Sequence, residues 1–263
     1  MNSPLKWAGS KRWQVPMLKE RLGFIAQELT LGTRRLVEPF CGGLNIALGL
    51  EPKYAVLNDV NPWLMNFWRC LQLGAPFELD ELAPGSYFII RSAFNLLTTS
   101  GQADMQLLRM AEYFYALNQW AFNGLYRVNS RGEFNVPPRP VLKPLQALDV
   151  IGYQKALENW SLYAGDYQEI WLAPGDLIYA DPPYDDGFTG YSAGKFTWDD
   201  QQRLAQWLAA HTGPVVAMNK ATRRVQQLYF DLGFEIELID APQRMHHAMG
   251  STDETLEMMA TKL

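Results

Sequence analysis

The chain has 263 residues, of which 48% are hydrophobic and 13% aromatic, so it can bury a full core in one large domain or in one domain that carries a sizeable insertion, and we expect the second. No apolar run is long enough to cross a bilayer, which argues against a membrane protein. The only cysteines, Cys41 and Cys70, lack paired metal spacing, which argues against a disulfide framework and a zinc site. The net charge of −5 argues against a uniformly basic surface for nucleic acid, although charge distribution matters more than the sum.

The amino-terminal segment precedes every element that we expect in the core. Residues 1–13 have no apolar signal core, and with only two cysteines in the chain we expect a cytoplasmic protein. Within this segment, residues 5–11 supply an aromatic face at Trp7 and a cation at Lys11. By themselves these residues would be an ordinary basic tail.

The first expected elements form a strand, a turn and a helix. Residues 36–40 predict a buried strand, residues 41–43 a tight turn and residues 45–50 the start of a helix. Gly42 and Gly43 let the backbone approach a nucleoside closely, although a glycine pair is more often only a turn.

A second strand is expected at residues 54–59 and ends in a carboxylate. Asp59 lies about 20 residues beyond the glycine turn, which suits contact with a ribose diol. The alternative is that Asp59 caps a helix that begins near Pro62.

The pattern changes between residues 61 and 149, which we interpret as an inserted domain. Residues 86–99 and 103–120 carry apolar side chains at helical spacing, and residues 125–136 predict a β-hairpin or an extended loop. Residues 118–143 hold four cations and one anion, a local charge of +3 that indicates a DNA-facing stripe or merely a solvated face.

Alternation of strands and helices resumes after the insertion. Strands are expected at residues 161–165, 176–180, 214–218, 234–239 and 256–263. Thr197, with Asp200 three residues later, predicts the cap of a helix that runs to Ala210. Residues 185–195 contain three glycines, and we expect a loop that is poorly ordered without DNA and closes over the site.

Asp181-Pro182-Pro183-Tyr184 follows an apolar strand and is the strongest chemical signal in the chain. The amino nitrogen of adenine is a poor nucleophile, and a carboxylate with a backbone carbonyl can accept its two N–H bonds and orient it. A tyrosine supplies an aromatic face for a flipped base. The alternative is a proline-stiffened turn with an ordinary aspartate.

Together these segments resemble the Dam-type, or D12 class, family of DNA adenine-N6 methyltransferases over nearly the whole chain. The most specific segments are PLKWAGSK at residues 4–11, VEPFCGG at 37–43, LNDVN at 57–61, NGLYRVN at 123–129, RGEFNVP at 131–137 and DPPY at 181–184. The resemblance implies an α/β fold: a class I methyltransferase domain with a Rossmann-like mixed sheet and helices on both faces (residues 1–60 and 150–263). It also implies a mostly helical DNA-recognition domain with a β-hairpin, inserted at residues 61–149.

The resemblance also implies roles for individual residues. Catalysis falls to Asp181, Pro182, Pro183 and Tyr184. S-adenosylmethionine, with no metal, is held by Trp7, Ala8, Gly9, Lys11, Glu38, Pro39, Phe40, Gly42, Asp59, Asp166 and Asp181. Double-stranded DNA is contacted by Lys6, Phe122, Asn123, Leu125, Arg127, Arg131, Pro137 and Arg139.

Two departures from the family pattern stand out. Leu44 and Asn45 replace further small residues after the glycines, and Asp253 and Glu254 stand where many members are basic.

The sequence leaves three alternatives open: a methyltransferase of RNA adenine, one of cytosine N4, or a DNA-binding regulator without catalysis. We expect a monomer without an obligate protein partner, in a bacterial or phage-infected cell. The recognition sequence, and whether the source is a host, a phage or a restriction system, stay open.

Overall fold

A single seven-stranded sheet forms the centre of the computed structural model, which describes residues 1–100, 106–185, 196–240 and 256–263. The strand order is β3-β2-β1-β4-β5-β7-β6. The strands are β1 (Leu36–Glu38), β2 (Ala55–Asp59), β3 (Trp160–Ala164), β4 (Leu177–Ala180), β5 (Val215–Lys220), β6 (Glu235–Asp240) and β7 (Leu256–Lys262). The first five run parallel, and β7 lies antiparallel between β5 and β6. This mixed sheet confirms the expected Rossmann-like methyltransferase fold.

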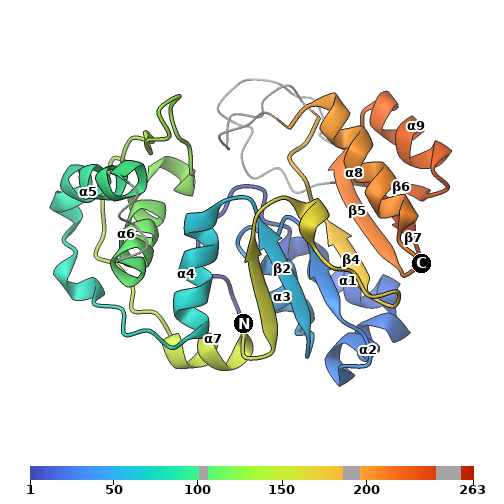
Figure 1. Cartoon of the computed structure of the whole chain (residues 1–263), viewed down its shortest axis with the longest axis horizontal. Coiled ribbons are helices and arrows are strands. Elements are labelled where there is room, and N and C mark those ends of the chain that lie inside the picture. The colour runs from blue at the N-terminus through green and yellow to red at the C-terminus, as the bar shows by residue number, and fades with distance from the viewer. Residues whose placement is uncertain (101–105, 186–195, 241–255) are drawn as a thin grey trace.

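Helices cover both faces of this sheet, and a separate group lies beside it (Figure 1). The helices around the sheet are α1 (Val15–Leu22), α2 (Phe24–Leu31), α3 (Asn45–Leu50), α8 (Trp198–Ala210) and α9 (Arg223–Asp231). The helices between β2 and β3 are α4 (Pro62–Gln72), α5 (Tyr87–Ser100), α6 (Leu107–Trp120) and α7 (Val150–Ala156). No helix in the described part of the chain is long and apolar enough to cross a membrane.

Alternate strand residues enter two different hydrophobic clusters, one on each face of the sheet. Leu36 and Tyr179 belong to the cluster under α1 to α3, whereas Val37 and Ile178 pack with α8 and α9. This alternation follows from the period of two in a strand, because successive side chains point to opposite faces.

The helices of the insertion continue the first of these clusters. Trp68 of α4 and Trp120 of α6 are fully buried in the cluster that also contains Leu36 of β1. Helix α4 contacts both β2 and β3 and packs against α6, so it joins the sheet to the outer helices. The division into domains at residues 61 and 149 stays a prediction.

Several element boundaries differ from those expected. The first strand ends at Glu38 because Pro39 has no N–H to continue the ladder. Helices α1 and α2 were not predicted, although Pro16 at the start of α1 and left-handed Gly32 after α2 are typical helix boundaries. The capping box of Thr197 and Asp200 at the start of α8 is confirmed.

The expected hairpin is a tight turn with very little regular pairing. Asn129 and Gly132 close the turn at the predicted position, and Val128 and Phe134 form an isolated bridge. The side chain of Asn129 accepts hydrogen bonds from the backbone N–H groups of Arg131 and Glu133. Such local bonds compete with a strand ladder, which explains why no extended β-ribbon forms here.

Candidate active site

Four acidic residues line one edge of the sheet. Glu38 ends β1, Asp59 ends β2, Asp166 comes two residues after β3, and Asp181 follows β4. These four strands are adjacent and parallel, so their carboxyl ends meet at the same edge. This edge is where ligands bind in open α/β sheets.

Asp59 joins the two strand-end loops through hydrogen bonds to the backbone. Its Oδ2 accepts from the N–H of Gly42 at 3.1 Å, and its Oδ1 accepts from the N–H of Asn61 at 2.9 Å. The helix cap considered for Asp59 belongs instead to Asn61, whose side chain accepts from Trp63 and Leu64 at the start of α4. Burial raises the pKa of Asp59 to about 6, against the effect of its two backbone hydrogen bonds.

Trp7 lies against the glycine turn that follows β1. A Cβ on Gly42, whose φ is +47°, would lie 2.7 Å from Trp7 Nε1, and a Cβ on Gly43 would lie 2.9 Å from Trp7 Cβ. The two glycines are therefore required by the approach of Trp7. Leu44 follows in the left-handed region at φ 54° and is fully buried, a conformation that costs about 1 to 2 kcal/mol for a residue with a side chain.

Glu38 is a buried carboxyl with an unused oxygen. It is 2% exposed, and its Oε1 has no hydrogen-bond partner among the described residues. Burial raises the pKa of Glu38 to about 8, and the charge of Asp181 adds to this effect. An unsatisfied buried acceptor is costly, so this oxygen suits a donor from a bound ligand.

The remaining predicted donor-site residues surround this edge. Pro39 is buried, and its carbonyl accepts from the Asn58 side chain at 3.0 Å. The half-buried ring of Phe40 contacts the Tyr167 ring at 5.4 Å between centroids. Asp166 is exposed and caps the short helix at Tyr167–Glu169 through the N–H of Gln168. Ala8 is half-buried, and Gly9 is exposed with open space around it.

Asp181 and Tyr184 lie beside a buried lysine from the amino-terminal segment. Lys11 Nζ is 3.8 Å from Asp181 Oδ1 and 4.5 Å from the centroid of the Tyr184 ring. Burial raises the pKa of Asp181 to about 6, the Lys11 charge opposes this shift, and the charge of Glu257 reinforces it. Asp181 is therefore ionised at neutral pH, which is the form that accepts hydrogen bonds from an amino group.

Two buried amides, which the sequence did not single out, fix the backbone of the tetrad. Gln201 of α8 donates from Nε2 to the Pro183 carbonyl at 2.8 Å, and Asn219 of β5 donates from Nδ2 to Gln201 Oε1 at 2.9 Å. Both are almost completely buried. The Pro182 carbonyl accepts no such bond from the described residues. Of the two proline carbonyls, only that of Pro183 is thus occupied by a side-chain amide in the described part of the chain.

Glu257 of β7 is a further residue that the sequence did not single out. Its Oε1 accepts from Lys11 Nζ at 2.7 Å, and its Oε2 accepts from Gln14 Nε2 at 3.1 Å. Gln14 Oε1 in turn accepts from the hydroxyl of Tyr179 at 2.7 Å. Strand β7 is antiparallel, so its first residues reach the edge where β4 and β5 end, and no local motif signals this position.

The predicted DNA-contacting residues lie on the loop between α6 and the hairpin. Phe122 and Asn123 are exposed in the short helix at Phe122–Gly124, and Asn123 is left-handed with φ 55°. Leu125 is half-buried. Arg127 is exposed and donates from Nε to Asn135 Oδ1 at 2.7 Å, so the rest of its guanidinium faces outward.

The other predicted cations of this region differ in their surroundings. Arg131 is exposed and pairs with Glu133 at 2.8 Å. Lys6 Nζ donates to the Gln119 carbonyl at 3.1 Å, and burial together with the charges of Arg139 and Lys143 lowers its pKa. Lys6, Arg139 and Lys143 thus form a cationic cluster. Lys143 belongs to the basic stripe expected at residues 118–143 but was not predicted to contact DNA.

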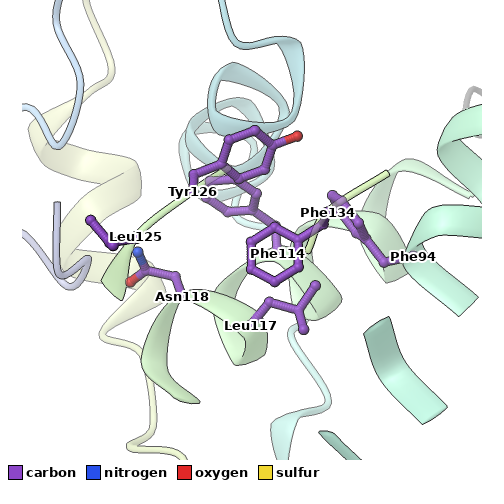
Figure 2. Close-up of a pocket in the computed structure, with 7 residues that line it drawn as sticks. All are labelled: Phe94, Phe114, Leu117, Asn118, Leu125, Tyr126 and Phe134. Carbon is purple, nitrogen blue, oxygen red and sulfur yellow. The ribbon is translucent and has the colours of Figure 1, made fainter. Parts of the chain in front are cut away.

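A small pocket with a cavity volume of about 10 Å³, partly open to solvent, lies beneath the hairpin loop (Figure 2). It is lined by Phe94, Phe114, Leu117, Asn118, Leu125, Tyr126 and Phe134. None of the carboxylates at the edge of the sheet lines it. We interpret it as a packing gap in the aromatic cluster that supports the loop, because the cluster also contains close ring pairs such as Tyr126 with Phe134.

Some predicted features lie outside the described residues. These are residues 186–195 of the expected closing loop, together with Asp253 and Glu254, which depart from the family pattern. In residues 1–100, 106–185, 196–240 and 256–263, no group of three or more His, Cys, Asp or Glu side chains is arranged to hold a metal ion.

The family described as D12 class N6 adenine-specific DNA methyltransferase matches residues 7–245, which include every carboxylate of the sheet edge except Glu257. The chain belongs to this family. The family that we expected from the sequence, and its reaction of methyl transfer to N6 of adenine in DNA, are thereby confirmed.

Curated relatives agree with this assignment. The chain is 33% identical to the DNA N-6-adenine-methyltransferase of Escherichia phage P1 over 89% of its own length, but it spans only 32% of that protein. It is 30% identical to the Retron Ec67 DNA adenine methylase of Escherichia coli, covering 99% of this chain and 91% of the relative. It is also 30% identical to the DNA adenine methylase of Vibrio cholerae O395, covering 97% and 94%.

Proposed function

We propose that this chain transfers a methyl group from S-adenosylmethionine to N6 of an adenine flipped out of double-stranded DNA. The observation that carries the proposal is the position of the Asp181 carboxylate beside the Pro182 carbonyl, which accepts no hydrogen bond from the described residues, at the sheet edge that also holds Glu38 and Asp59. Membership of the adenine-specific family supports DNA over RNA and adenine over cytosine.

The donor site is proposed at the ends of β1 and β2. Glu38 offers a buried oxygen that has no partner among the described residues, which suits the amino group of the donor, and Asp59 retains acceptor capacity for ribose hydroxyls. Trp7 and Phe40 give flat apolar surfaces beside them. The exposed Asp166 lies at the same edge and suits the donor's adenine. S-adenosylmethionine supplies a methyl group on a positively charged sulfur.

The catalytic step is proposed to depend on hydrogen-bond acceptors held in advance. Asp181 and the Pro182 carbonyl accept hydrogen bonds from the two N–H groups of the adenine amino group. These bonds direct the nitrogen lone pair toward the methyl donor. Gln201 occupies the Pro183 carbonyl and so holds this backbone in place. Tyr184 offers its ring to the flipped base.

Double-stranded DNA is the proposed partner of the inserted segment, residues 61–149. The cluster of Lys6, Arg139 and Lys143 suits phosphate contacts, and exposed Phe122 and Asn123 suit entry into the base stack. We propose that the protein works as a monomer in the cytoplasm. The bacterial and phage origins of the relatives support that location.

Replacement of Asp59 by alanine is expected to weaken donor binding by roughly 1 to 3 kcal/mol, because ribose hydroxyls would lose a buried acceptor. Isothermal titration calorimetry with S-adenosylmethionine and no DNA measures the change directly. Asp149→Ala is the matched control, since Asp149 caps α7 away from the sheet edge. Equal donor affinity in Asp59→Ala and the wild type would remove Asp59 from the site.

Arg127→Ala is expected to relax sequence preference at one base pair, while methylation of near-cognate sites persists. An arginine fork to guanine is worth about 1 to 3 kcal/mol of discrimination. A phosphate contact predicts instead a uniform loss on all sequences and a shallower salt dependence. Methylation of a cognate duplex and its single-base variants at two salt concentrations separates the outcomes. A uniform loss would rule out base reading by Arg127.

A further inference from the structure

Lys11 lies between two carboxylates from opposite ends of the chain. Its ammonium is 2.7 Å from Glu257 Oε1 but 3.8 Å from Asp181 Oδ1, so it makes a hydrogen bond to the first and only a longer ion pair with the second. All three groups are shielded from solvent, with side-chain exposures of 8% for Lys11, 11% for Glu257 and 19% for Asp181. Shielding strengthens charge interactions within this cluster.

The Glu257 carboxylate is itself held in a fixed orientation. Gln14 donates to its second oxygen at 3.1 Å, and the Tyr179 hydroxyl fixes Gln14 at 2.7 Å. Gln14 is fully buried and Tyr179 nearly so, and both lie directly behind the cluster. One oxygen of Glu257 therefore accepts a hydrogen bond from Gln14, and the other accepts one from Lys11.

We propose that Glu257 is a positioning residue that holds the Lys11 ammonium away from Asp181 and so keeps the Asp181 oxygens free for the adenine amino group. The proposal rests on the proposed catalytic role of Asp181. Without a second carboxylate, the buried ammonium would close on Asp181, the one other carboxylate that pairs with it among the described residues. Asp181 would then accept hydrogen bonds from Lys11 rather than from the substrate.

The charges that face Asp181 give this arrangement a measurable signature. Lys11 lies on the amino-terminal segment, Glu257 on β7, Tyr179 and Tyr184 on or after β4, and Glu38 on β1. Lys11 lowers the pKa of Asp181, whereas Glu257 raises it. Loss of the Glu257 charge, followed by closer approach of Lys11, therefore lowers the pKa of Asp181.

Glu257→Gln tests the proposal because it keeps the shape of the side chain and removes its charge. The value of kcat, measured on duplex DNA with saturating donor and DNA, is expected to fall about tenfold or more, because Lys11 would then occupy the Asp181 carboxylate. The raised pKa of Asp181 predicts an acid limb of the pH profile near pH 6 in the wild type, and in Glu257→Gln this limb is expected to move about one unit lower. Glu235→Gln, on the exposed face of β6, is the matched control and should leave both unchanged.

The pH profile distinguishes positioning from a merely structural effect. A lower kcat with an unmoved acid limb, or a wild-type kcat, would overturn the proposal. Should Glu257→Gln fail to fold by circular dichroism, Glu257→Asp is used, with a smaller shift in the same direction expected and an unmoved limb overturning the idea. Absence of methylation by the wild type itself would overturn the proposed function, and this proposal with it.

Discussion

Asp181→Ala is expected to reduce methyl transfer about a thousandfold or more while the protein stays folded. The reason is that the carboxylate acts on the adenine amino group mainly in the transition state, where a preorganised acceptor has its largest effect. Removal of a buried charge that faces Lys11 also leaves Glu257 to satisfy the ammonium, so the site retains a counterion. Single-turnover methylation of duplex DNA, with folding checked by circular dichroism, measures the loss.

Asp185→Asn is the control for this variant. Asp185 lies four residues beyond Asp181, and its carboxylate, which is 9% exposed, pairs with the exposed Arg224 rather than with Lys11. We expect this control to retain activity within a fewfold of the wild type. Turnover by Asp181→Ala within tenfold of the wild type would remove the carboxylate from the mechanism.

Gly124→Ala is expected to cost roughly 3 kcal/mol in the free energy of unfolding and to weaken donor binding as well. Gly124 has φ +65°, and a Cβ there would lie 2.3 Å from the Lys6 carbonyl oxygen, a backbone atom. The Asn118 side chain binds the Lys6 N–H at 2.9 Å and the Lys6 carbonyl at 3.0 Å. Displacement of Lys6 would break these bonds and move Trp7, the next residue, away from Gly42.

Gly132→Ala separates the clash from backbone strain alone. Gly132 also has a left-handed backbone, with φ +78°, but a Cβ there would meet no atom within 4 Å. We expect it to lose only about 1 kcal/mol, the usual cost of a left-handed residue with a side chain. Urea unfolding and donor calorimetry are measured for both variants. Similar losses in both would contradict the account of Lys6 and Trp7 docking on Gly124.

Local patterns in the sequence predicted most of the sheet edge. Apolar strands that end at Asp59 and Asp181, with a glycine turn after β1, identify the carboxyl edge because parallel strands share their direction. The capping box at Thr197 could also be predicted, because its hydrogen bonds lie within one helical turn.

The rest depends on contacts between distant segments. Glu257 meets Lys11 across 246 positions, and Gln201 meets Pro183 only because α8 packs beside β4. Antiparallel insertion of β7 brings Glu257 to the edge, and no motif of residue spacing encodes that. The turn predicted within residues 125–136 is present, but side-chain bonds of Asn129 limit the strand pairing beside it to an isolated bridge.

Analysis of the methylated nucleoside tests the central claim most directly. Duplex DNA is incubated with the wild-type protein and labelled S-adenosylmethionine, digested to nucleosides and resolved by liquid chromatography with mass spectrometry. The account predicts N6-methyldeoxyadenosine as the labelled product with the wild type, and none above background with Asp181→Ala. Label in N4-methyldeoxycytidine, or no label with a folded wild-type protein that binds DNA, would contradict it.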